Sequence, residues 1–141
     1  MTSALALEGL LVFLVDDDFD TREVFSLIFE AAGANVIVAG SVSEALLLLE
    51  TCQPDILLSD FKLPDGDGCL LLKEVRARFA ERSASIPGVS EAMPKAIAVT
   101  GLAGDMDSER LIEAGFQALV SKPVELDALV EIVARLARSK S

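Results

Sequence analysis

Five short apolar runs, separated by stretches with helical periodicity, constrain the fold of this 141-residue chain more than any other feature. Within each run the apolar residues are consecutive and do not alternate with polar ones, as in strands buried on both faces of a parallel sheet. The runs lie at residues 10–15, 36–39, 56–58, 96–99 and 118–120. Strand and helix thus alternate five times. This predicts a flavodoxin-like α/β domain, a five-stranded parallel doubly wound sheet flanked by five helices with right-handed crossovers.

Apolar spacing predicts which face of each helix is buried. In the first helix, over about residues 19–32, the expected inward residues are Val24, Phe25, Ile28 and Ala31. The third helix should begin near Cys69 and bury Leu72, Val75 and Phe79. The fourth should span about residues 105–114. The last carries the clearest i, i+3, i+4, i+7 stripe, formed by Leu126, Leu129, Val130, Val133, Leu136 and Ala137.

Local signals predict where several helices begin and end. Gly33 and Gly115 stand where two helices should end, as glycines just after a helix do. Ser41 and Glu44 have the spacing of a capping box at the start of the second helix. Residues 81–94 are rich in serine, proline and glycine, and we expect a long surface loop there.

Composition excludes several classes of function. The net charge is −11, which argues against direct binding to nucleic acid or to an anionic membrane. The chain contains no histidine, so Ser-His-Asp and Cys-His catalysis, histidine metal sites and a phosphohistidine carrier role are excluded. Residues 1–9 lack the basic start of a signal peptide, and no apolar run is long enough to cross a bilayer. We therefore expect a cytoplasmic protein with reduced cysteines, with an N-terminal extension over 1–9 and one domain over 10–138.

Polar residues that carry chemistry follow four of the five predicted strands. Asp16 and Asp17 follow the first strand, Asp60 the third, Thr100 the fourth, and Lys122 the fifth. Five consecutive strand–helix units suit the strand order 2-1-3-4-5, in which ligands bind at the carboxyl ends of strands 1 and 3. The topology is therefore expected to bring all five side chains to one edge of the sheet.

The residue types at this edge suit metal-assisted phosphoryl transfer. Three carboxylates in one pocket repel each other unless some are protonated or a cation joins them. A small set of hard oxygen ligands favours Mg²⁺. A lysine and a threonine hydroxyl opposite the metal can hold a phosphoryl group, and an aspartate can act as a nucleophile that forms an acyl phosphate.

Four segments, each at a predicted strand end, resemble the receiver domain of two-component response regulators. They are Val-Asp-Asp-Asp at 15–18, Asp-Phe-Lys-Leu-Pro-Asp-Gly-Asp-Gly at 60–68, Val-Thr-Gly at 99–101 and Ser-Lys-Pro at 121–123. The resemblance covers about residues 10–136. It implies a CheY-like phosphoacceptor that catalyses only its own phosphorylation and dephosphorylation.

The resemblance also implies a role for each site residue. Asp60 is the implied phosphoacceptor, and Thr100 and Lys122 are the implied phosphoryl-binding pair. The implied Mg²⁺ site uses Asp17 as a direct ligand, Asp16 to orient a metal-bound water, Asp60, and the backbone carbonyl of Lys62. The Lys122–Pro123 bond is usually cis in this family, and an X-Pro sequence permits that.

Some residues depart from the family pattern or have a simpler explanation. Leu119 stands where the family usually has a tyrosine or phenylalanine that changes position on activation, so the usual aromatic readout is not expected. Leu102, two residues after Thr100, offers no group to position water, and we expect slow autodephosphorylation. Structural roles suffice for four acidic residues. Asp18 and Asp20 are each expected to cap the first helix or to interact favourably with its dipole, and Asp65 and Asp67 are expected to be turn residues.

Three functions compete for these residues. The first is a phosphoacceptor switch, either a stand-alone regulator or part of a hybrid sensor kinase. Its donor would be a histidine kinase or histidine phosphotransfer protein. Its output would be a downstream protein, linked kinase modules or a phosphorylation-dependent dimer, contacted by the fourth helix, fifth strand and fifth helix. The second is a pseudo-receiver that binds partners without phosphorylation. The third is a haloacid-dehalogenase-type phosphatase, disfavoured because Asp105 and Asp107 lie too late to supply its second acidic pair.

Overall fold

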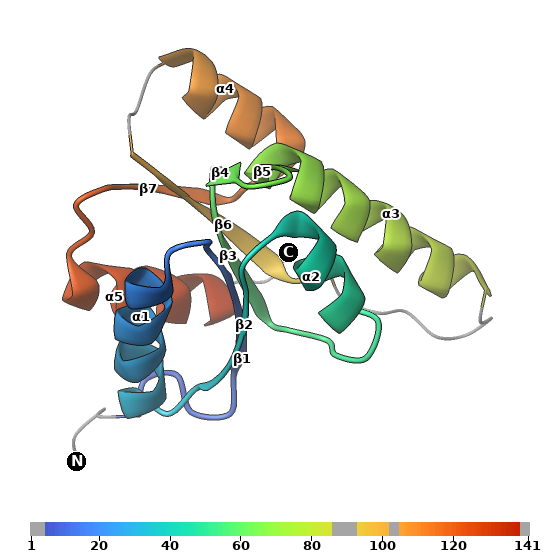
Figure 1. Ribbon diagram of the computed structural model, residues 1–141. Coiled ribbons are helices and arrows are strands. Elements are labelled where there is room, and N and C mark those ends of the chain that lie inside the picture. The colour runs from blue at the N-terminus through green and yellow to red at the C-terminus, as the bar shows by residue number, and fades with distance from the viewer. Residues whose placement is uncertain (1–4, 86–92, 102–104, 139–141) are drawn as a thin grey trace.

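A computed structural model describes residues 5–85, 93–101 and 105–138, and contains every predicted strand and helix, together with a short hairpin that was not predicted (Figure 1). The strands are β1 (Leu11–Val15), β2 (Asn35–Ala39), β3 (Ile56–Asp60), β4 (Lys62–Leu63), β5 (Gly66–Asp67), β6 (Lys95–Thr100) and β7 (Ala118–Ser121). The helices are α1 (Phe19–Ala31), α2 (Val42–Leu48), α3 (Gly68–Ser85), α4 (Asp105–Ala114) and α5 (Leu126–Arg138).

The main sheet is parallel throughout and has the order β2-β1-β3-β6-β7. This confirms the predicted order 2-1-3-4-5, because β4 and β5 pair only with each other. Figure 1 shows α1 and α5 on one face of the sheet and α2, α3 and α4 on the other. The doubly wound architecture places the carboxyl ends of β1 and β3 side by side.

Alternate residues of the central strands fill two apolar cores, one on each face. Phe13 and Leu57 lie in the core beneath α2, α3 and α4, together with the predicted inward residues of α3. Leu14 and Leu58 lie in the core beneath α1 and α5. Because both faces are covered, the strands read as continuous apolar runs in the sequence.

The buried face of α1 differs from the predicted one. Phe25 is buried as expected and Ile28 is half-buried, but Val24 is 45% exposed and Ala31 is also exposed. Phe29 is instead fully buried and contacts Phe25 edge to face, with ring centroids 6.4 Å apart. The helix is rotated toward Phe29 because that orientation removes the larger apolar side chain from water.

The helix-end signals are largely confirmed. Gly33 and Gly115 have positive φ angles of 100° and 114°, which glycine adopts without steric cost. The Ser41 hydroxyl accepts the Glu44 N–H at 3.1 Å and caps α2. The Glu44 carboxylate accepts the N–H of Gly40 at 2.6 Å, one residue before the position expected in a capping box.

The predicted surface loop does not begin at residue 81, because α3 continues to Ser85. The Arg82 guanidinium stabilises this extension because it donates to the Leu49 carbonyl at 2.8 Å and lies over the Phe79 ring. Residues 86–92 of the predicted loop lie outside the described part of the chain. Before β1, Leu7 is fully buried, and its N–H donates to the Ala32 carbonyl at 2.8 Å. None of the described helices is both long enough and apolar enough to cross a membrane.

Candidate functional site

The predicted site residues meet at the carboxyl edge of the sheet. Asp60 and Thr100 are the last residues of β3 and β6, Asp16 and Asp17 follow β1, and Lys122 follows β7. All but Asp16 line a pocket of about 410 Å³, whose walls are Asp17, Asp60, Phe61, Lys62, Leu63, Pro64, Thr100, Gly101 and Lys122. Asp16 lies beneath this pocket, with only 2% of its surface exposed. The fold therefore brings together residues that are up to 106 positions apart, from 16 to 122.

Three carboxylates form the acidic part of the site. One oxygen from each of Asp16, Asp17 and Asp60 lies within 4.8 Å of the other two. Burial raises the pKa of Asp16, and the negative charges of Asp60 and Asp17 raise it further. The Asp18 N–H, which donates to Asp16 at 2.8 Å, and the nearby Lys122 ammonium act in the opposite direction. A divalent cation would offset this repulsion, and the all-oxygen donor set fits Mg²⁺.

Lys122 provides the positive charge of the site. Its Nζ lies 3.3 Å from Oδ2 of Asp60, and the Asp60 side chain is only 11% exposed. The Lys122 N–H donates to the Thr100 carbonyl at 2.8 Å, which joins the ends of β6 and β7. The Lys122–Pro123 peptide is cis, as the resemblance implied. The ammonium therefore lies where it can bind an oxygen carried by Asp60.

Thr100 supplies a buried hydroxyl that has no hydrogen-bond partner among the described residues. The residue is 4% exposed, and its Oγ1 makes no hydrogen bond to any described residue. A buried hydroxyl in this condition costs about 1–3 kcal/mol, and a role in binding or catalysis is one explanation for such a cost. A donor in this wall of the pocket is suited to an oxyanion bound beside Asp60.

Sequence reasoning missed the role of Arg22 in α1. Its guanidinium donates to the Asp16 carbonyl at 2.7 Å and lies 5.8 Å from the centre of the Phe19 ring. It therefore ties α1 to the segment that carries the acidic pair. An arginine six residues after Asp16 carries no recognisable signal on its own, because its partner is a backbone atom.

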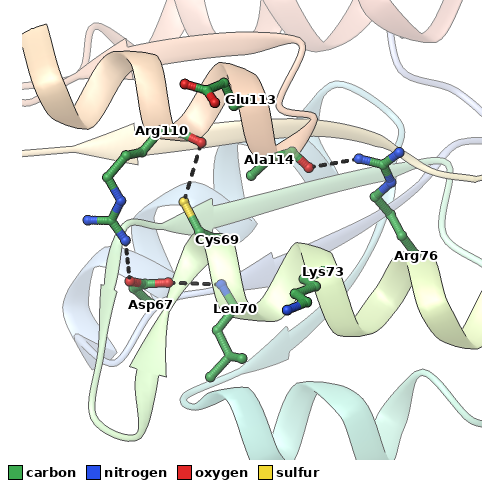
Figure 2. A pocket seen from close by; sticks show the side chains of 8 residues that line it. All are labelled: Asp67, Cys69, Leu70, Lys73, Arg76, Arg110, Glu113 and Ala114. Carbon is green, nitrogen blue, oxygen red and sulfur yellow. Dashed lines mark hydrogen bonds and ion pairs between the residues drawn. The ribbon is translucent and has the colours of Figure 1, made fainter.

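Four acidic residues were predicted to have structural roles, and three of them make hydrogen bonds or ion pairs that fit such roles. Asp18 caps α1 by accepting the Thr21 N–H at 3.0 Å. Asp67 accepts the Leu70 N–H at 2.8 Å in the first turn of α3 and pairs with Arg110 of α4 at 3.3 Å (Figure 2). Asp65 also has a structural role, but its partners lie in α2 and not in its own turn. Asp20 lies exposed in the first turn of α1.

Leu119 occupies the position of the usual aromatic residue. It is half-buried and packs against the core beneath α2, α3 and α4, the core that also contains Phe116. Leu102, the basis of the expected slow dephosphorylation, lies outside the described residues. The position where the resemblance expects an aromatic ring is thus filled by a half-buried aliphatic side chain.

A second, larger hollow of about 630 Å³ lies between α3 and α4 (Figure 2). Two of its polar side chains join the two helices. Arg76 donates to the Ala114 carbonyl at 3.0 Å, and the Cys69 thiol donates to the Arg110 carbonyl at 3.8 Å. This hollow contains no cluster of metal-binding carboxylates among the described residues, in contrast to the smaller pocket.

Comparison with known proteins agrees with this geometry. Residues 12–134 match the response regulator receiver domain family. The chain is 31% identical over 122 residues to the polar-differentiation response regulator DivK of Brucella ovis, covering 86% of this chain and 91% of DivK. It is 33% identical to the sensor histidine kinase AtsR of Burkholderia thailandensis, over 87% of this chain but only 19% of that kinase.

A solved structure shows the same architecture. The CheY-like receiver domain protein of Methanospirillum hungatei superimposes with a TM-score of 0.77 at 28% identity, covering 90% of this chain and 92% of that one. The fold and site thus define a CheY-like signalling domain of two-component systems. The chain belongs to the response regulator receiver domain family, as its four motifs predicted.

Proposed function

We propose that this receiver domain accepts a phosphoryl group on Asp60 and thereby changes a protein-binding surface. The observation that carries the proposal is the arrangement around Asp60. Two further carboxylates each place an oxygen within 4.8 Å of an Asp60 oxygen, and the Lys122 ammonium lies at 3.3 Å. The Thr100 residue lines the same pocket, and its buried hydroxyl has no partner within the described part of the chain. This arrangement combines a nucleophile, cation ligands and oxyanion donors.

In the proposed reaction, a carboxylate oxygen of Asp60 attacks the phosphorus of a phosphohistidine. The new O–P bond forms an acyl phosphate as the N–P bond breaks, and the electron pair of that bond returns to the histidine nitrogen. The Lys122 ammonium then pairs with a phosphoryl oxygen, and the Thr100 hydroxyl donates to another. Asp17, Asp60 and the Lys62 carbonyl would hold Mg²⁺, and Asp16 would orient a metal-bound water. The ion would neutralise negative charge on the transferred group.

The proposed partners follow from this chemistry. A histidine kinase or histidine phosphotransfer protein supplies the phosphoryl group, since the chain has no histidine of its own. The proposed output surface comprises α4, β7 and α5, and reaches a downstream protein, a linked kinase module or a second copy of the chain. The similarity to DivK, a response regulator matched over 91% of its length, supports a stand-alone regulator. The similarity to 19% of the sensor histidine kinase AtsR supports a domain within a kinase. The cytoplasmic location and the slow autodephosphorylation stay predictions.

One observation favours the alternative of a phosphorylation-independent interaction module. Leu119 lacks the ring and hydroxyl through which related domains are thought to report phosphorylation. The intact set of Asp16, Asp17, Asp60, Thr100 and Lys122 favours the phosphoacceptor.

The direct test is intact-mass spectrometry of the wild-type chain after incubation with acetyl phosphate. With Mg²⁺ we expect one added phosphoryl group per chain. With excess EDTA we expect none, because the acidic cluster would then carry uncompensated charge. Absence of the adduct in a folded protein that binds Mg²⁺ would favour the interaction module.

Thr100→Val should have opposite effects on stability and on phosphorylation. Valine has nearly the same shape as threonine but no buried hydroxyl, so we expect the free energy of unfolding to rise by about 1 kcal/mol. Loss of the donor should slow phosphorylation by acetyl phosphate by roughly tenfold or more. Urea unfolding followed by circular dichroism and a mass-spectrometric time course measure the two effects. A destabilised variant would show that the hydroxyl has a partner in the unphosphorylated protein.

A further inference from the structure

The β4–β5 hairpin connects the proposed phosphoacceptor to α3 and contains a proposed metal ligand. Each strand has only two residues, with Lys62 opposite Asp67 and Leu63 opposite Gly66. Pro64 and Asp65 form the turn. A two-stranded hairpin is marginally stable alone, and this one is very short. Its position, and with it the position of the Lys62 carbonyl, therefore depends on contacts with neighbouring elements.

Asp65 makes the most extensive polar contact of this hairpin. Its Oδ1 accepts the Val42 N–H at 2.8 Å, and its Oδ2 accepts the Ser43 N–H at 3.0 Å and the Ser43 hydroxyl at 2.6 Å. Val42 and Ser43 are the first two residues of α2, where free N–H groups favour a negative charge. These hydrogen bonds lower the pKa of Asp65 to about 2, so the carboxylate is ionised at neutral pH.

The other contacts restrain the hairpin from different sides. The Leu63 side chain is buried in the core. This apolar contact keeps β4 against the core, but it does not fix the orientation of the hairpin. Asp67 pairs with Arg110 of α4, but the Arg110 side chain is 54% exposed, and ion pairs of that kind contribute little (Figure 2). At the base of the hairpin, the Phe61 N–H donates to the Val99 carbonyl at 2.9 Å and the Phe61 carbonyl accepts the Gly68 N–H at 2.7 Å. Asp65 adds the directional restraint at the turn, toward α2 and three residues from Lys62.

We propose that Asp65 is a positioning residue for the metal site, because its three hydrogen bonds to the start of α2 hold the hairpin that carries the Lys62 carbonyl. The inference rests on the proposed Mg²⁺ site and adds a residue that makes no contact with the metal. Mg²⁺ requires near-ideal octahedral geometry, whereas Ca²⁺ accepts longer and more variable distances. A loosened hairpin should therefore weaken Mg²⁺ binding more than Ca²⁺ binding.

The test measures binding of each metal alone to the full chain by isothermal titration calorimetry. For Asp65→Ala we expect the Mg²⁺ affinity to fall by about threefold to tenfold, less than the effect of many groups that contact a metal ligand directly. The Ca²⁺ affinity should fall less, so that the ratio of Mg²⁺ to Ca²⁺ affinity decreases. A merely structural role for Asp65 would leave this ratio unchanged.

Two matched controls separate positioning from stability. Ser41→Ala removes the other cap of α2, and Arg110→Ala removes the ion pair to Asp67, while both leave Asp65 bonded to α2. Both should retain the wild-type ratio. If Asp65→Ala does not fold, Asp65→Asn and Ser43→Ala, which weaken the same contact in part, should lower the ratio to intermediate values.

The outcomes distinguish this inference from the proposed function. An unchanged ratio in a folded Asp65→Ala, or in both partial variants, overturns the positioning role although the wild type binds Mg²⁺. Failure of the wild type itself to bind Mg²⁺ overturns the proposed metal site, and the positioning role with it.

Discussion

Replacing Asp60 by asparagine is expected to abolish phosphoryl incorporation from acetyl phosphate in the presence of Mg²⁺. The carboxamide is a poor nucleophile, and it removes one of the three carboxylates that form the acidic cluster. It also removes the negative partner of Lys122, whose Nζ lies 3.3 Å from Oδ2 of Asp60. We therefore expect no adduct by intact-mass spectrometry and weaker binding of Mg²⁺ by calorimetry.

Asp20→Asn is the matched control for this experiment. Asp20 is exposed in the first turn of α1 and lines neither the phosphoacceptor pocket nor the acidic cluster. This variant makes the same chemical change and should gain one phosphoryl group at the wild-type rate. An adduct on Asp60→Asn would mean that another side chain is the acceptor, and peptide mapping of that adduct would identify it.

Phe29→Ala is expected to lower the free energy of unfolding by about 3–5 kcal/mol, the usual range for an aromatic side chain removed from a core. Phe29 is fully buried beneath the sheet and contacts Phe25, so truncation leaves a cavity that the rigid strands cannot fill. Urea unfolding followed by circular dichroism measures the change. A loss of this size is a large share of the total stability of a small domain.

Val24→Ala in the same helix is the control. Val24 is 45% exposed, and its truncation should change the free energy of unfolding by no more than about 0.5 kcal/mol. The apolar spacing predicted Val24 on the buried face of α1, whereas the structure exposes it. A large effect at Val24 with a small one at Phe29 would support the face predicted from the spacing and contradict the observed rotation of α1.

Local pattern was sufficient to predict the architecture and the candidate site. Continuous apolar runs occur where both faces of a strand are covered, so the five strands of the sheet could be recognised without any contact information. Their carboxyl ends must share one edge in a parallel sheet. The position of Asp60, Thr100 and Lys122 after their strands therefore predicted that these residues meet. The residues that cap α1 and α2 could also be predicted from the sequence, because each lies within one turn of its helix.

Other features depend on contacts between residues distant in the sequence. The partners of Asp65 lie 22 and 23 positions away, so its sequence neighbours indicate only a turn. The extension of α3 depends on Arg82 reaching the carbonyl of Leu49, 33 positions earlier. The rotation of α1 toward Phe29 and the burial of the Thr100 hydroxyl arise only when helices and strands pack. Periodicity and residue type report local conformation, whereas side-chain pairing is set by which surfaces the folded chain brings together.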